Sequence, residues 1–147
     1  MKIIVINGPN LNFLGIREKA VYGNRDYAYL ENMIMEKGKE LGCQVSVWQS
    51  NHEGAIIDRL QECYFDGTDA IIINPGAYTH YSYAIRDALA SLENLIKIEI
   101  HISDITDRES FRAVSVTREV CDEQIYGMGL EGYTKAMEMA LDMFGKK

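Results

Sequence analysis

Cysteine and proline are scarce in this chain, which has three cysteines and two prolines among 147 residues. Cys43, Cys63 and Cys121 lie far apart and form no Cys-x-x-Cys pair, so neither a disulfide framework nor a zinc site is predicted. We expect all three side chains to be small buried hydrophobes with reduced thiols, which is typical of a cytoplasmic protein.

Long apolar runs and excess positive charge are also absent. No apolar stretch approaches the length of a membrane span, and the apolar residues within 1–7 are too few for a signal peptide. The formal net charge is −7, whereas nucleic acids and anionic membranes attract clusters of Lys and Arg. Neither partner is therefore expected, although a few arginines and backbone N–H groups can still bind a small anion locally.

Several catalytic and cofactor motifs are missing as well. Residues 8–15 form neither a dinucleotide fingerprint nor a phosphate-binding P-loop, and no Gly-x-Ser-x-Gly elbow occurs. No lysine stands out as a nucleophile, and the three histidines lack the helical spacing of a metalloprotease. We therefore expect an enzyme that needs neither a metal nor an organic cofactor.

Apolar β-branched runs alternate with amphipathic helical patterns along the chain. The predicted strands cover 3–6, 44–49, 70–73 and 95–100, with a short fifth strand at 125–126. The predicted helices follow Asp26, Ser50 and Ser82, and a last one covers 131–144. This order predicts an α/β fold and a single domain over 1–147. We expect a three-layer flavodoxin-like sandwich whose five-stranded parallel sheet has the order 2-1-3-4-5.

Helix ends carry recognisable capping residues. Asp26 is expected to cap the first helix and Gly42 to end it. The sequence Ser50-Asn51-His52-Glu53 has the form of a capping box for the second helix, whose apolar stripe is expected to include Tyr64.

Polar residues follow the predicted strands at their carboxyl ends, where open α/β sheets bind ligands. Glu99 and His101 are two residues apart on a strand and so share a face, where the carboxylate can fix the imidazole tautomer and raise its basicity. A lone histidine there is more often structural, but this pairing favours a general acid or base. Asn74-Pro75-Gly76-Ala77, with Ile102 and Ser103, predicts a cradle for a carboxylate.

The loop between the first strand and the first helix is unusually long and is predicted to be a lid. It carries Arg17 and Tyr22. A nearby guanidinium favours the phenolate form of a tyrosine, which would make Tyr22 a base. Spacing alone leaves open a solvated arginine and a packing tyrosine.

The sequence resembles the type II 3-dehydroquinate dehydratases over nearly its whole length. The motifs that carry the resemblance are Ile6-Asn7-Gly8-Pro9-Asn10-Leu11, Arg17-Glu18 with Val21-Tyr22-Gly23, Gln49-Ser50-Asn51-His52-Glu53-Gly54, Asn74-Pro75-Gly76-Ala77 with Thr79-His80, Arg86-Asp87-Ala88, Glu99-Ile100-His101-Ile102-Ser103, Arg108-Glu109 and Phe111-Arg112. The resemblance implies the reversible dehydration of 3-dehydroquinate to 3-dehydroshikimate through an enolate, in the shikimate or quinate pathway.

The resemblance also implies catalytic roles. Tyr22, as phenolate, removes the proton beside the ketone, and Arg17 lowers the pKa of that phenol. Asn10 stabilises the enolate through water. His101, held by Glu99, protonates the departing hydroxyl.

The same resemblance implies how the substrate is bound. Asn74, Ile102 and Ser103 bind its carboxylate, and His80 and Arg112 bind its ring hydroxyls. No cofactor and no metal take part.

Asp87 in this family reaches the site of a neighbouring subunit, and the resemblance implies a homo-oligomer, a dodecamer. The sequence departs from the family pattern at Lys19, Asp104, Asp107 and 117–119. We expect none of these departures to touch a catalytic position.

Two other interpretations make different predictions. A non-catalytic flavodoxin-like binding module would lack at least one of Arg17, Tyr22 and His101. Another enzyme of the same fold, acting on a different cyclic hydroxy acid, would differ at Asn74, His80 or Arg112.

Overall fold

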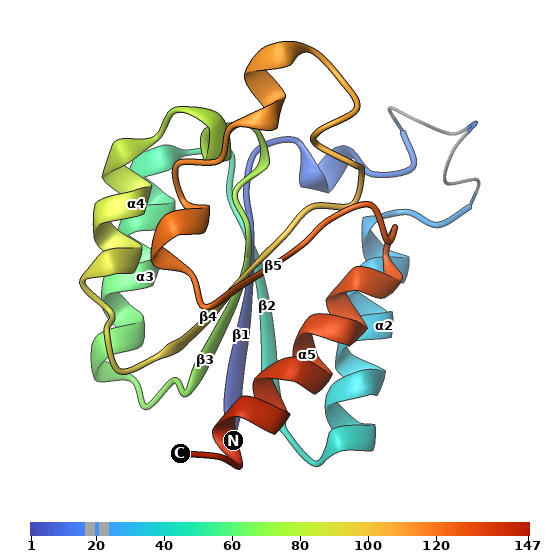
Figure 1. Ribbon diagram of the computed structural model, residues 1–147. Coiled ribbons are helices and arrows are strands. Elements are labelled where there is room, and N and C mark those ends of the chain that lie inside the picture. The colour runs from blue at the N-terminus through green and yellow to red at the C-terminus, as the bar shows by residue number, and fades with distance from the viewer. Residues whose placement is uncertain (17–19, 21–23) are drawn as a thin grey trace.

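The strands of the protein form one parallel sheet. The computed structural model describes all residues except 17–19 and 21–23. Within the described part, five strands follow the order β2-β1-β3-β4-β5 (Figure 1), which confirms the predicted fold and strand order. The strands are β1 (Lys2–Asn7), β2 (Gln44–Gln49), β3 (Ala70–Asn74), β4 (Ile96–Ile100) and β5 (Glu123–Ile125).

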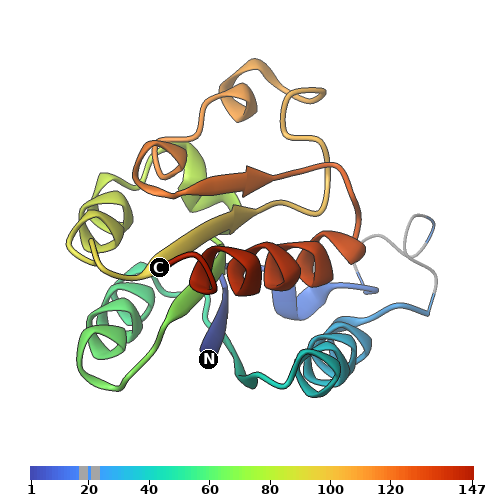
Figure 2. The ribbon, with the colours of Figure 1, turned by 60° about the horizontal axis from the view of Figure 1, so that its bottom comes forward.

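Pairs of helices cover both faces of this sheet and complete the predicted three-layer sandwich. On one face α2 (Tyr27–Leu41) lies beside α5 (Glu131–Phe144), and on the other α3 (Glu53–Phe65) lies beside α4 (Tyr83–Ala90) (Figures 1 and 2). Short 3-10 helices occur in the loops: η1 (Leu11–Phe13), η2 (Gly76–His80), η3 (Ser110–Ala113) and η4 (Arg118–Val120).

The central strands are buried on both faces, which explains their continuous apolar sequence. In β1, Ile3 and Val5 pack into the core under α2 and α5, whereas Ile4 and Ile6 pack into the core under α3 and α4. Successive side chains of a strand point to opposite faces, so one apolar run supplies both cores.

The predicted ends of α2 are confirmed. The side chain of Asp26 accepts a hydrogen bond from the backbone N–H of Tyr29 at 2.8 Å. Gly42 ends the helix at φ 67°, a left-handed conformation that costs glycine little.

The predicted capping box at the start of α3 is wrong. The helix begins only at Glu53, and the hydroxyl of Ser50 accepts from the backbone N–H of His52 instead. Glu53 receives a hydrogen bond from the hydroxyl of Ser82, at the start of α4, at 2.7 Å. The contact between Ser82 and Glu53, which joins the starts of α4 and α3, thus takes the place of the predicted local capping box.

The structure corrects two further expectations, one about a side chain of α3 and one about the end of β5. Tyr64 is 66% exposed because Cys63, at 1%, takes the inward position at the end of α3. Strand β5 ends at Ile125, one residue earlier than predicted, and Tyr126 is exposed. Of the other cysteines, Cys121 is buried as expected, whereas Cys43 is only half-buried.

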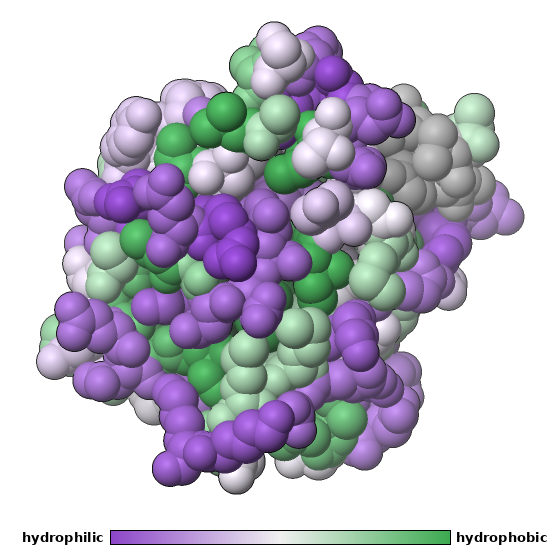
Figure 3. Space-filling view, in the orientation of Figure 1, coloured by the Kyte–Doolittle hydropathy of each residue, from purple (hydrophilic) through white to green (hydrophobic). Residues whose placement is uncertain are grey.

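Polar and apolar residues are mixed on the face of the molecule shown in Figure 3. Among the described residues, no helix combines the length and apolar character that crossing a membrane requires.

The loops after β1 and β3 approach each other closely at Gly8. The N–H of Gly8 donates to the carbonyl of Asn74 at 2.7 Å. A Cβ atom at Gly8 would lie 2.7 Å from the carbonyl oxygen of Pro75, closer than real Cβ contacts come. Only glycine therefore lets the two loops meet at the carboxyl edge of the sheet.

We predict that Gly8→Ala lowers the free energy of unfolding by about 1–3 kcal/mol, because the new methyl group meets backbone atoms that cannot move aside easily. Gly54→Ala is the matched control, since its Cβ would meet nothing within 4 Å. That change should leave stability unchanged or raise it by up to about 1 kcal/mol. Urea denaturation measures both values, and equal stability of the two variants would contradict the packing argument.

Candidate active site

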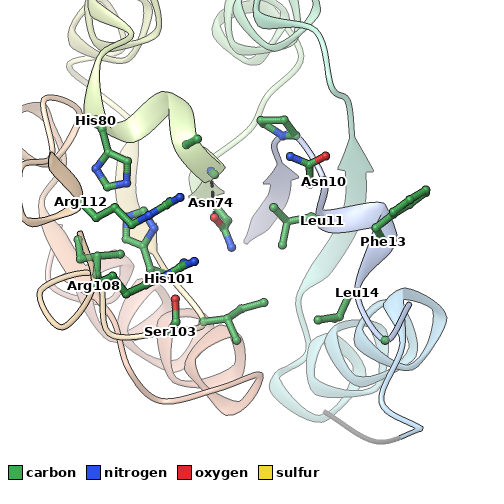
Figure 4. A pocket seen from close by; sticks show the side chains of 16 residues that line it. Asn10, Leu11, Phe13, Leu14, Asn74, His80, His101, Ser103, Arg108 and Arg112 are labelled. Carbon is green, nitrogen blue, oxygen red and sulfur yellow. Dashed lines mark hydrogen bonds between the residues drawn. The ribbon is translucent and has the colours of Figure 1, made fainter. Parts of the chain in front are cut away.

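A cavity of about 220 Å³ lies at the carboxyl edge of the sheet, between the loops that follow β1, β3 and β4 (Figure 4). Seven of the eleven residues assigned from the sequence line it: Asn10, Asn74, His80, His101, Ile102, Ser103 and Arg112. In Figure 4, Asn10 lies on one side, the two histidines and Arg112 on the other, and Asn74 between them. The predicted convergence of these segments is therefore confirmed.

The lining of this cavity is electropositive, although the protein as a whole is acidic. Arg108 and Arg112 bring positive charge to it beside the imidazoles of His80 and His101, and no Asp or Glu lines it among the described residues. Such a lining favours a small anionic ligand. Arg108 belongs to one of the family motifs, but the sequence alone does not indicate a role for it.

His101 and Glu99 form the expected pair. Nε2 of His101 lies 3.1 Å from Oε2 of Glu99, and the Glu99 side chain is fully buried behind the ring. An ionised carboxylate can only accept, so Nε2 must carry a hydrogen and donate it. Nδ1 is then the ring nitrogen left to exchange a proton with a ligand in the cavity.

Four further side chains donate to Glu99 besides His101. Thr79 and Ser115 donate from 2.9–3.0 Å, and the hydroxyl of Thr117 and the amide of Gln124 make short contacts. The expectation that the 117–119 departure touches no catalytic position is therefore wrong. In sequence Thr117 lies far from Glu99, and only the turn before η4 brings it there.

These contacts keep Glu99 ionised. Burial alone would raise the pKa of its carboxyl group, but the hydrogen bond and charge of His101, with the hydrogen bonds of Thr117 and Gln124, lower that pKa to about 2. His101 is therefore paired with a full negative charge at every pH at which enzymes usually work.

Asn74 is held by hydrogen bonds from both atoms of its amide. Its Oδ1 accepts from the N–H of Gly76 at 3.1 Å, and its Nδ2 donates to the Tyr133 hydroxyl at 2.9 Å. That hydroxyl in turn donates to Asn7 at 2.7 Å. Because an amide nitrogen carries two hydrogens, one N–H of Asn74 remains for a ligand.

His80 and Arg112 are also fixed by neighbours. Nδ1 of His80 donates to the carbonyl of Val114 at 2.7 Å, so that in the neutral ring its Nε2 is an acceptor. Nε of Arg112 donates to Glu109 at 2.6 Å, and its guanidinium lies 4.9 Å from the ring centre of Phe111. The remaining guanidinium N–H groups suit oxygen atoms of a bound hydroxy acid.

Asn10 adopts a left-handed conformation, with φ 68°, that presents it at the mouth of the cavity. Its backbone N–H donates to the side-chain oxygen of Asn51 at 3.0 Å, and Gln49 donates to the same oxygen at 3.0 Å. Part of the Gln49–Gly54 motif thus supports the Asn10 loop, a role that the sequence did not reveal.

Two assigned residues that the structure describes do not line the cavity. Glu99 lies behind His101, and the exposed side chain of Asp87 lies on α4 beside Arg86. Arg17 and Tyr22 lie outside the described residues, as does Lys19, so the structure describes the predicted lid only in part. The Asp87 assignment concerned a neighbouring subunit and stays a prediction.

No group of three or more His, Cys, Asp and Glu side chains suited to a metal ion occurs in the part of the chain that the structure describes. The groups that the cavity does offer are an oriented imidazole, amides and guanidinium groups. Fold and site together define a flavodoxin-like α/β protein with an acid–base site for a small anion.

Known proteins share this architecture along the whole chain. Residues 1–141 match the family model described as Dehydroquinase class II, so the chain belongs to the class II dehydroquinase family. The 3-dehydroquinate dehydratase of Lachnospira eligens is 59% identical over the full length of both chains. That of Lachnoclostridium phytofermentans is 63% identical over 97% of this chain and 98% of its own.

A solved structure agrees with this assignment. The type II dehydroquinase from Butyrivibrio crossotus is 65% identical in sequence and superimposes with a TM-score of 0.93. The match covers 95% of this chain and 97% of that one.

The depressed pKa of Glu99 predicts a pH-dependent contribution to stability. A carboxyl whose folded pKa is about 2, against an ordinary 4.5, stabilises the fold above the ordinary value and loses that effect as the pH falls towards 2. Relative to Glu99→Gln, the wild type should therefore lose about 2 kcal/mol of unfolding free energy as the pH falls from about 5 to about 3. Urea denaturation at fixed protein concentration measures it, and a difference that does not vary with pH would refute the assignment.

Proposed function

We propose that the protein is a hydro-lyase that converts 3-dehydroquinate reversibly into 3-dehydroshikimate through an enolate intermediate. The observation that carries this proposal is the cation-lined cavity in which an imidazole is held by a buried carboxylate. Membership of the class II dehydroquinase family and the activity for which its relatives are named support it. The reaction belongs to the shikimate pathway to aromatic amino acids, or to quinate breakdown.

The proposed reaction begins with removal of a proton from the carbon beside the ketone. Tyr22, as phenolate with Arg17 beside it, is the proposed base, an assignment that rests on the resemblance to the family. The negative charge then moves to the ketone oxygen, and Asn10, through a water molecule, is the proposed donor to it.

The second step expels the hydroxyl group. Nδ1 of His101 donates a proton to the leaving oxygen, because hydroxide is a poor leaving group and departs as water. The enolate collapses to the conjugated ketone as the carbon–oxygen bond breaks. Tyr22 then returns its proton to solvent, and His101 takes one up.

The substrate is proposed to bind through its carboxylate and hydroxyls. The remaining N–H of Asn74, the Ser103 hydroxyl and the backbone of Ile102 and Ser103 suit the carboxylate. His80 and Arg112 suit the ring hydroxyls, because one presents an acceptor and the other several donors.

We also propose that the chain works as one domain over 1–147 in the cytoplasm and assembles as a dodecamer. The exposed side chain of Asp87 on α4 is consistent with a role in the site of a neighbouring subunit. Light scattering tests this directly, since twelve chains of 16.7 kDa give a mass far from that of a monomer or trimer.

We predict that wild-type protein mixed with 3-dehydroquinate produces ultraviolet absorbance, since only the product is conjugated. His101→Ala should lower kcat by about 100-fold or more, the usual contribution of a general acid. Tyr22→Phe should abolish turnover and leave the far-ultraviolet circular dichroism unchanged.

His52→Ala is the matched control, because His52 is exposed and lies outside the cavity. It should retain wild-type kcat and KM. No absorbance change with the wild type would refute the activity, and wild-type turnover by Tyr22→Phe would refute the assigned base.

A further inference from the structure

The carboxylate of Glu99 is surrounded by hydrogen-bond donors from four separate segments of the chain. Thr79 comes from η2, Ser115 and Thr117 from the turn between η3 and η4, and Gln124 from β5. The fifth donor is His101, two residues after Glu99. The side chains of Thr79 and Thr117 are as fully buried as Glu99 itself.

These donors exceed what the carboxylate can accept. Its two oxygens offer about four lone-pair sites, whereas three hydroxyls, one amide and one imidazole each bring a hydrogen. The hydroxyl oxygens of Thr79 and Ser115, and those of Thr79 and Thr117, also lie 2.8 Å apart, so one hydroxyl can donate to another. Together with the imidazole, these groups therefore saturate the carboxylate with hydrogen bonds.

Saturation changes how strongly Glu99 acts on the imidazole. Each donated hydrogen bond draws negative charge away from the carboxylate and towards its donor. A less saturated carboxylate would direct more of its charge onto His101 and would favour the protonated ring, which then gives up a proton less readily. An acid that must release its proton in every cycle works better with a partner whose charge is shared.

We propose that Thr117 and Gln124 are positioning residues for the dehydration reaction, which share the charge of Glu99 and orient it so that His101 stays a strong enough acid. This inference rests on the proposed function. Neither residue lines the cavity, so both act through Glu99 and not on the substrate.

Other ionisable groups surround this pair and bear on its titration. On the cavity side, His101 shares the lining with His80, Arg108 and Arg112. Lys97, two residues before Glu99 on β4, donates to the carbonyl of Leu92. Burial and the nearby charge of Glu99 raise the pKa of Cys121 to about 12, so that thiol stays neutral. Arg118 and Asp122 lie beside it.

Thr117→Val tests the proposal, since it removes the hydroxyl and keeps the shape. We expect kcat for 3-dehydroquinate to fall between roughly threefold and tenfold while KM stays within about twofold. The alkaline limb of the pH–kcat profile should move to higher pH by roughly half a unit, because the ring holds its proton more tightly. Glu99→Gln removes the charge itself and should move that limb in the opposite direction.

Three further variants serve as controls. Thr117→Ser keeps a hydroxyl and should restore the wild-type profile. Thr68→Val removes a buried hydroxyl that donates to a carboxylate, Asp66, at the opposite edge of the sheet, and should leave kcat and the profile unchanged. Gln124→Met should shift the alkaline limb of the pH–kcat profile to higher pH, as Thr117→Val does. If Thr117→Val does not fold, Gln124→Met tests the proposal in its place. A fall in kcat with an unmoved limb would overturn the proposal, because a merely structural role predicts that result.

A measurement without substrate separates this proposal from the proposed function. The proton resonances of the His101 ring, followed by NMR from about pH 5 to about pH 9, report its protonation directly. The midpoint should be higher in Thr117→Val than in wild type whether or not 3-dehydroquinate is turned over. An unchanged or lower midpoint would overturn the charge-sharing role, whereas absent turnover by the wild type would overturn only the activity.

Discussion

The buried, hydrogen-bonded pair of Glu99 and His101 is the interaction on which the rest of the site depends. Burying a carboxylate away from water is costly unless hydrogen bonds and an opposite charge compensate it. Here five donors from β5, η2, the residue after β4 and the turn before η4 meet at one side chain. The same contacts that satisfy the charge also fix the loops that carry the cavity lining.

The parallel sheet supplies the geometry around this pair. Asn7 is in register with both Gln49 and Asn74, and Ile73 with Glu99, so the last residues of neighbouring strands end at one level. The Tyr133 hydroxyl then joins Asn7 to Asn74 beneath the cavity. Cationic and amide groups accumulate where the strands end, and an acidic protein thereby offers a local site for an anion.

The features of the fold and site that depend on local residue spacing could be predicted from the sequence. The continuous apolar strands, the Asp26 cap and the pairing of Glu99 with His101 follow from local spacing, and all are confirmed. The capping box at Ser50 was wrong because a contact with Ser82 decides where α3 begins. The role of Thr117 was missed because only long-range folding brings it to Glu99, and no local pattern marks a threonine as a partner of a buried charge.

The ionisation state of Glu99 tests this account most directly. With ¹³C-labelled glutamate, NMR follows the side-chain carboxyl carbon of Glu99 through an acid titration, and its resonance is assigned by its loss in Glu99→Gln. The account predicts a midpoint of about 2, with the carboxylate ionised throughout the neutral range. A midpoint at or above the ordinary value of 4.5 would mean that the donors do not hold the charge, and it would contradict the account.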